Sequence, residues 1–278
     1  MFQFNYVKAK SLGEAQALLA SHPDAKLLSG GMTLIPTLKQ RLAQPSHLID
    51  IGGLGELRGI EVKGARLEIG AATRHYEVAT SAVVKKSLPA LAALANEIGD
   101  PQVRNRGTIG GSIANNDPAA DYPAAVLALD ATIATTKREI AADDFFQGMF
   151  ATALEEGEIV VRVKFNIPKR AAYQKFAHPA SGYAMTGVFV ADGASGVRVA
   201  VTGAASGVFR WAEAEQALVK KMDPAVLEGL KLATDDMNED IHATREYRAN
   251  LVRVMTKRAV QKLLTDKSAG PQRNARRK

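Results

Sequence analysis

The sequence of 278 residues contains no cysteine. This absence excludes disulfide bonds, thiolate catalysis, cysteine-ligated zinc and any iron–sulfur cluster held by this chain. Long apolar runs are missing too, and none approaches the roughly 18 residues that a transmembrane helix needs. The first residues, MFQFNYVKAK, lack the basic segment and apolar core of a secretory signal. We therefore expect a cytoplasmic protein without an integral membrane segment.

Negative charge is in the minority, because 36 Lys and Arg residues outnumber 29 Asp and Glu residues and give a formal net charge of +7. Five of these charges lie in residues 267–278, KSAGPQRNARRK, which contain no acidic residue. We expect this basic tail to be disordered and solubilising, with binding to RNA or acidic lipid as the alternative. Aromatic residues make up only 6% of the chain and are not interleaved with basic ones, which argues against a nucleic-acid-binding protein.

Hydrophobic periodicity predicts an α+β chain whose pattern changes near residue 170. Residues 1–50 predict a β–α–β unit whose helix begins with a capping box at Ser11–Glu14. After residue 170 we expect three antiparallel strands and then helices that begin at Trp211. The expected elements before residue 170 are strands at 26–29, 48–50, 131–136 and 159–167, a hairpin at 60–70, and helices at 32–41, 76–81, 87–98 and 122–129. The expected strands after it are 173–176, 184–190 and 196–202.

Residues 99–121 carry Gly, Asn, Asp and Pro so densely that we expect a long loop, and a loop of this length in a compact domain is commonly functional. Asp121, at its end, either caps the following helix or accepts hydrogen bonds from ligand hydroxyls. Arg104–Arg106 either neutralise phosphate or hold the loop.

Two glycine pairs flanked by hydroxyl residues, Ser29–Thr33 and Thr108–Ser112, are the clearest candidate binding motifs. Neither fits the Walker loop or the GxGxxG fingerprint. Glycine pairs allow close approach of a ligand to the backbone, and successive N–H groups in such turns form anion sites. Each pair alone could be an ordinary tight turn. Together they favour a pyrophosphate held from both sides.

The stretches LLSGGMTLIPTLKQRL (27–42) and GDPQVRNRGTIGGSIANNDPAADYPA (99–124) resemble the two FAD-binding signatures of the medium subunit of molybdenum hydroxylases. This is the family of xanthine dehydrogenase and aerobic carbon monoxide dehydrogenase. The resemblance extends over about residues 1–265. It implies an α+β fold: a two-part FAD-binding domain of the vanillyl-alcohol-oxidase type, followed by a C-terminal domain with a three-stranded antiparallel sheet and helices. The implied boundaries are 1–170 for the FAD-binding domain, with subdomains of about 1–55 and 56–170, 171–266 for the C-terminal domain and 267–278 for the tail.

The resemblance also implies roles for individual residues. The two glycine motifs would wrap the FAD pyrophosphate, Asp121 would bind cofactor hydroxyls, and residues 70–73 would lie beside the isoalloxazine. Lys175 would lie near the flavin N1–C2=O edge, where a cation stabilises reduced flavin, and Tyr183 would approach the flavin face. A surface lysine and a sheet-packing tyrosine are the alternatives for these two. The implied cofactor-binding residues are Ser29, Gly30, Gly31, Met32, Thr33, Leu34, Ala72, Thr73, Thr108, Ile109, Gly110, Gly111, Ser112, Asp121, Lys175 and Tyr183.

The family resemblance implies an electron-transfer subunit in which no residue acts as acid, base or nucleophile. A large partner would hold the molybdopterin cofactor, a small partner would hold two [2Fe-2S] clusters, and FAD on this chain would pass electrons to an external quinone or NAD. Relatives form a dimer of heterotrimers. The substrate stays open between carbon monoxide, a purine, an aldehyde and an N-heterocycle.

A stand-alone FAD-dependent oxidase is the alternative, and it would need a proton acceptor near the flavin N5. The sequence offers no persuasive candidate for that group. The five histidines share no metal-ligand spacing, so we expect no metal site. His75 follows the expected flavin segment and is the one histidine worth locating.

Overall fold

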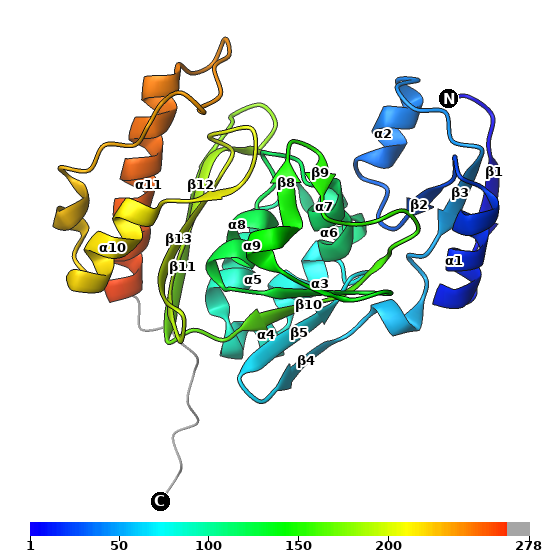
Figure 1. The fold of residues 1–278 in the computed structure, drawn as a ribbon, viewed down its shortest axis with the longest axis horizontal. Coiled ribbons are helices and arrows are strands. Elements are labelled where there is room, and N and C mark those ends of the chain that lie inside the picture. The colour runs from blue at the N-terminus through cyan, green and yellow to red at the C-terminus, as the bar shows by residue number, and fades with distance from the viewer. Residues whose placement is uncertain (266–278) are drawn as a thin grey trace, which may run out of the picture.

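The computed structural model describes residues 1–265, so the predicted basic tail lies outside the described residues. The N-terminal part is a three-stranded parallel sheet in the order β1-β3-β2, which lies at one end of the molecule (Figure 1). Its elements are β1 (Asn5–Lys8), α1 (Leu12–Ser21), β2 (Lys26–Leu28), α2 (Leu34–Lys39) and β3 (His47–Asp50), with a short 3-10 turn, η1, at Gly55–Leu57. Ser11 caps α1 as predicted, because its hydroxyl accepts a hydrogen bond of 3.1 Å from the Glu14 N–H.

A five-stranded antiparallel sheet in the order β4-β5-β10-β6-β7 occupies the middle of the molecule. One face buries apolar side chains such as Leu67, Val163 and Phe165 in the same hydrophobic cluster as the surrounding helices. Its strands are β4 (Ile60–Lys63), β5 (Arg66–Gly70), β6 (Thr132–Thr135), β7 (Glu139–Ala141) and β10 (Val160–Asn166). Around it lie α3 (His75–Thr80), α4 (Ala82–Ser87), α5 (Pro89–Asn96), α8 (Tyr122–Ala128), α9 (Ala142–Phe145) and a small hairpin of β8 (Phe146–Gly148) and β9 (Ala151–Thr152).

The prediction of one long loop over residues 99–121 is wrong, because the segment contains α6 (Pro101–Arg106) and α7 (Ile109–Asn115). The Asp100 carboxylate caps α6 by accepting from the Val103 N–H at 2.8 Å, and Pro101 occupies its first turn. The Thr108 hydroxyl caps α7 by accepting from the Gly111 N–H at 3.2 Å. The second glycine pair therefore lies inside a helix, where its lack of side chains permits close packing.

The C-terminal part is an antiparallel sheet in the order β11-β12-β13-β14. The three predicted strands are present as β11 (Arg170–Ala177), β12 (Ala184–Gly193) and β13 (Gly196–Thr202), and the two-residue strand β14 (Phe209–Arg210) extends the sheet to four. Helices α5 and α8 pack against one face, while α10 (Ala212–Lys220) and α11 (Arg245–Thr265) pack against the other. Between α10 and α11 lie a 3-10 turn, η2 (Pro224–Leu227), and irregular chain, so this region is less helical than the sequence predicts.

The α+β prediction is thus confirmed. Trp211 lies at the start of α10 and is buried in the C-terminal hydrophobic cluster, as a core residue. Among residues 1–265 no helix is both long and apolar enough to cross a membrane.

Candidate functional site

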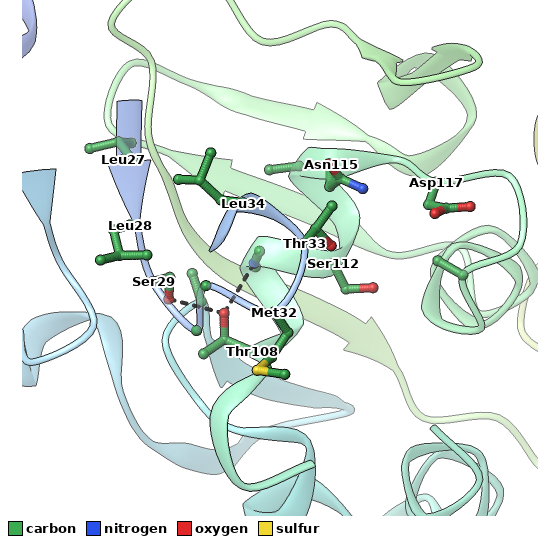
Figure 2. Close-up of a pocket in the computed structure, with 18 of the residues that line it drawn as sticks. Leu27, Leu28, Ser29, Met32, Thr33, Leu34, Thr108, Ser112, Asn115 and Asp117 are labelled. Atoms are coloured by element: carbon green, nitrogen blue, oxygen red, sulfur yellow. Dashed lines mark hydrogen bonds between the residues drawn. The ribbon is translucent and has the colours of Figure 1, made fainter. Parts of the chain in front are cut away.

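A cavity of about 860 Å³ opens between the N-terminal sheet and helices α6 and α7. Its walls come from the segment that joins β2 to α2, from residues 71–75 after β5, from the 98–121 region and from the loop before β12. The volume lies in the upper part of the range for small-molecule sites. The cavity therefore joins segments that are far apart in the sequence, and Figure 2 shows part of its wall.

The first glycine motif offers free backbone donors. Within residues 1–265, the N–H groups of the four residues from Gly30 to Thr33 have no hydrogen-bond partner. Gly31 adopts φ of +74°, a left-handed conformation that favours glycine. Four consecutive N–H groups without acceptors among the described residues, on residues of a cavity wall, are donors of the kind that bind anions.

The second glycine motif uses its N–H groups inside the protein. Ile109 donates to the Thr73 carbonyl at 3.1 Å and Gly110 donates to the Ala71 carbonyl at 2.8 Å. The Gly111 N–H is occupied by the Thr108 hydroxyl. The expectation that both glycine pairs supply N–H donors to a ligand is therefore wrong for the second pair and stays a prediction for the first. The residues that flank the second pair, Thr108 and Ser112, contribute polar side chains to the cavity wall.

A glycine in each motif lets the chain pack closely against another segment, and a hydroxyl pair joins the two motifs. A Cβ atom on Gly30 would lie 2.3 Å from the Arg106 carbonyl oxygen, and one on Gly110 would lie 2.5 Å from the Ala71 Cβ. The Ser29 and Thr108 hydroxyl oxygens are 3.0 Å apart and share a hydrogen bond (Figure 2). The close approach that glycine allows here is thus between chain segments, which together form one wall.

The segment beside the expected isoalloxazine position contributes Ala71, Ala72 and His75 to the cavity wall. Thr73 is buried but faces away from the cavity, where its hydroxyl lies 3.4 Å from the Gly59 carbonyl oxygen. Burial lowers the pKa of His75 to about 4, and the charge of Arg104 acts in the same direction. The imidazole is therefore neutral at pH 7, and its Nδ1 has no hydrogen-bond partner among the described residues.

Asp121 is the centre of a buried polar cluster at the cavity. Its carboxylate accepts from the Tyr173 hydroxyl at 2.5 Å and lies 3.0 Å from the Lys175 ammonium. It makes no side-chain capping bond to α8, so the capping interpretation is wrong. Burial raises the pKa of Asp121, while the Lys175 charge and the Tyr173 hydrogen bond act in the opposite direction.

The two residues predicted from the C-terminal part behave differently. Tyr183 lines the cavity and remains 48% exposed, so it is not a buried sheet-packing residue. The side chain of Lys175 is only 2% exposed, which excludes the surface-lysine alternative. Lys175 nevertheless lies behind Asp121 and is not part of the cavity wall.

The cavity brings together most of the residues predicted to bind the cofactor, with the exception of Thr73, Ile109 and Lys175. Arg104 donates to the carbonyls of Ile98 and Gly99 at 3.0 and 2.9 Å, so it holds the chain here, and it is not part of the cavity wall. Wall residues that the sequence reasoning did not assign include Ile98, Asp100, Val103, Asn115, Asp117 and Glu158. Asp100, Val103, Asn115 and Asp117 fall within the quoted second signature. Ile98 and Glu158 lie outside it and could be found only from tertiary structure.

The arrangement suits a ligand that combines an anionic centre with hydroxyl groups and an apolar part. Free N–H groups and hydroxyls meet at one wall, the Asp117 and Asp121 carboxylates can accept from ligand hydroxyls, and residues such as Leu28 and Ala72 provide apolar surface. Within residues 1–265 no three His, Asp or Glu side chains are grouped so that they could hold a metal ion.

Two family models together cover the described chain. Residues 2–169 match the model described as the FAD binding domain in molybdopterin dehydrogenase. Residues 169–263 match the CO dehydrogenase flavoprotein C-terminal domain.

Individual relatives match over nearly their full length. The carbon monoxide dehydrogenase medium chain of Hydrogenophaga pseudoflava is 38% identical, over 93% of this chain and 96% of the relative. The glyceraldehyde dehydrogenase medium chain of Sulfolobus acidocaldarius is 34% identical, over 92% and 97%. A chain in the solved structure of H. pseudoflava carbon monoxide dehydrogenase lacking the Mo-pyranopterin moiety matches with a TM-score of 0.87 at 38% identity, over 95% of this chain and 98% of that chain.

Proposed function

This chain belongs to the family of FAD-binding medium subunits of molybdopterin-dependent dehydrogenases, and from this premise we propose that it binds FAD in the cavity and conducts electrons through it. The observation that carries the proposal is the row of four partnerless N–H groups from Gly30 to Thr33. Donors of this kind suit a pyrophosphate, which is the anionic centre of FAD.

The residues of this chain would act by binding and orienting the cofactor. The Gly30–Thr33 N–H groups and the hydroxyls of Thr108 and Ser112 would hold the pyrophosphate, and Asp121 would accept from cofactor hydroxyls. Ala71 and Ala72 would provide a small apolar surface for the ring system. When bound, FAD supplies the ability to take up and release electrons singly or in pairs.

The absence of cysteine supports an electron relay on another chain. We propose that a small partner with [2Fe-2S] clusters delivers electrons, that a large partner with the molybdenum cofactor oxidises the substrate, and that a quinone or NAD is the acceptor. The proposed assembly is a dimer of heterotrimers. The relatives named above act on carbon monoxide and glyceraldehyde according to their names, so this chain alone does not define the substrate.

The proposed division into a FAD-binding domain at 1–170 and a C-terminal domain at 171–266 is supported by the two family models, which meet at residue 169. It is also supported by two separate hydrophobic clusters. The cavity draws wall residues from both parts, since Tyr183 belongs to the second.

Reconstitution tests the proposal. The recombinant chain is mixed with excess FAD, passed through a desalting column and examined for the blue absorbance band of protein-bound flavin. We expect retained flavin, and a protein fraction without that band would overturn the proposal. Purification from the native source then tests the partners: an isolated chain that oxidises a substrate without molybdenum and iron–sulfur subunits would favour the stand-alone oxidase instead.

A further inference from the structure

We infer that Lys175 acts on the cofactor site indirectly, as a positioning residue that keeps the Asp121 carboxylate ionised and oriented in the cavity wall. This inference rests on the proposed FAD binding and assigns Lys175 a role different from direct contact with the flavin.

The ammonium of Lys175 is buried and paired within the protein. Its Nζ lies 3.0 Å from Oδ1 and 3.2 Å from Oδ2 of Asp121, and 3.1 Å from the carbonyl oxygen of Glu97. Of the three N–H donors of a lysine ammonium, two form hydrogen bonds here, to Asp121 Oδ2 and to the Glu97 carbonyl oxygen. The contact with Asp121 Oδ1 is an ion pair. Because its side chain is only 2% exposed and lies outside the cavity wall, Lys175 makes its polar contacts inside the protein rather than in the cavity.

Asp121, in contrast, does reach the cavity. It forms part of the cavity wall although its side chain is only 4% exposed. Burial of this kind favours the neutral acid and raises the pKa of Asp121. The Lys175 charge is the largest effect that opposes burial, and the hydrogen bond from Tyr173 is the next.

The other ionisable groups around Asp121 cannot replace Lys175. Glu97, at the end of α5, carries a carboxyl group that repels a second negative charge. Three tyrosines interact with Asp121: Tyr122 beside it, Tyr173 on β11 and Tyr183 in the loop before β12. A tyrosine side chain is neutral or negative, so none of them can supply the positive charge. Without Lys175, the Asp121 carboxyl would retain its proton to a higher pH. A protonated Asp121 would lose acceptor capacity toward cofactor hydroxyls.

The test measures the FAD dissociation constant of the full chain as a function of pH. Lys175→Met keeps most of the side-chain length and removes the charge, and Lys175→Arg keeps the charge. For Lys175→Met we expect affinity to weaken by up to about tenfold for each pH unit below the raised pKa of Asp121, within a range where the unaltered chain binds with little pH dependence. Lys175→Arg should restore the flat profile. Lys164→Met is the matched control, because Lys164 pairs with Glu139 away from the cavity and should behave like the unaltered chain.

Two outcomes would overturn the inference. One is a Lys175→Met profile as flat as that of the unaltered chain. A changed reduction potential of the bound flavin in that variant would then indicate that Lys175 acts directly on the cofactor. The other is a pH dependence that persists when Asp121→Asn is added to Lys175→Met. If Lys175→Met does not fold, Tyr173→Phe provides the test, because loss of its hydroxyl should shift the profile in the same direction by less. Failure of the unaltered chain to bind FAD would overturn the proposed function, and with it the basis of this inference.

Discussion

Thr108 has two roles through one hydroxyl group. It caps α7 and shares a hydrogen bond with Ser29, a residue 79 positions earlier in the sequence. Thr108→Val preserves the shape of the side chain and removes both bonds. We expect a loss of about 1 kcal/mol in unfolding free energy, as for other lost N-caps, together with weaker FAD binding because the two glycine motifs separate.

Urea denaturation and FAD titration measure these two effects for Thr108→Val. Thr80→Val is the control, because the Thr80 hydroxyl bonds only to the Tyr76 carbonyl within its own helix. Equal FAD affinity in the two variants would contradict the role assigned to Thr108.

His75 makes the stability of the fold depend on pH. Burial lowers the pKa of its imidazole from 6.5 to about 4 in the folded chain. Protonation therefore favours the unfolded chain: the contribution of the neutral ring is complete above pH 6.5 and is lost as pH falls through about 4. A shift of this size corresponds to about 3 kcal/mol of unfolding free energy.

Comparison of the unaltered chain with His75→Gln isolates this contribution, because other titrating groups are common to both. Urea denaturation at several pH values should show that the unaltered chain loses about 3 kcal/mol more than the variant between neutral pH and about pH 4. Parallel curves for the two proteins would show that His75 titrates normally in the folded state.

At the residue scale, the sequence predicts the parts of the site that depend on local geometry. The Ser29–Leu34 motif, which is predicted to bind the cofactor, lines the cavity, because the turn and its neighbours follow directly from a glycine pair after a strand. Thr73, Ile109 and Lys175 do not line it. Whether a side chain faces the cavity or the core depends on contacts with distant segments, and the sequence contains no local signal for that choice.

At the element scale, the β8–β9 turn is held by a single residue, Asn116. The Asn116 amide donates to the carbonyls of Gly148 and Ala151, both at 2.7 Å, and the Asn116 carbonyl accepts from the Phe150 N–H at 3.1 Å. Asn116 itself is buried and adopts φ of 45°, and Phe150 adopts φ of 54°. The turn therefore exposes Phe150 in a conformation that is costly for a large side chain.

Replacement of Asn116 should release this turn. For Asn116→Ala we expect a loss of about 2–4 kcal/mol in unfolding free energy, because two carbonyl groups lose their donor and alanine disfavours the left-handed backbone. Asn116→Gly removes the same donor without the backbone cost, so it should lose about 1 kcal/mol less. Urea denaturation measures both losses, and full stability in either variant would show that the amide does not support the turn.

The sequence predicts most strands and the longer helices, because alternation and capping are local patterns. It fails at α6 and α7, where the density of Gly, Asn and Pro argues against helix. Asp100 and Thr108 provide the caps, and position 110 needs glycine because a side chain there would clash with Ala71. The helical structure of this segment depends on the packing of α7 against Ala71, directly after β5. Amino-acid composition gives no information about that contact.

At the scale of the whole molecule, the cavity links the two parts of the chain. Thr202 on β13 donates to the carbonyls of Pro118 and Ala120 at 2.9 and 2.7 Å, so the C-terminal sheet holds the segment that carries Asp121. FAD binding should therefore stabilise both parts together. We expect slower amide hydrogen exchange after FAD addition in residues 29–34 and also in residues 180–183, with α10 unaffected because it lies on the far face of the sheet.

Amide hydrogen exchange followed by mass spectrometry distinguishes joint protection of the two segments from protection of one segment alone or of the whole chain. Protection confined to residues 29–34 would mean that the C-terminal part does not take part in binding. Equal protection over the whole chain, α10 included, would indicate general stabilisation rather than a cavity shared by the two parts.

The most direct test of the central claim is a crystal structure of the full chain grown with FAD. We expect the pyrophosphate oxygens to lie within about 3.2 Å of the backbone nitrogens between Gly30 and Thr33, with Asp121 facing a cofactor hydroxyl. A pyrophosphate bound elsewhere, with these N–H groups still without partners, would contradict the account.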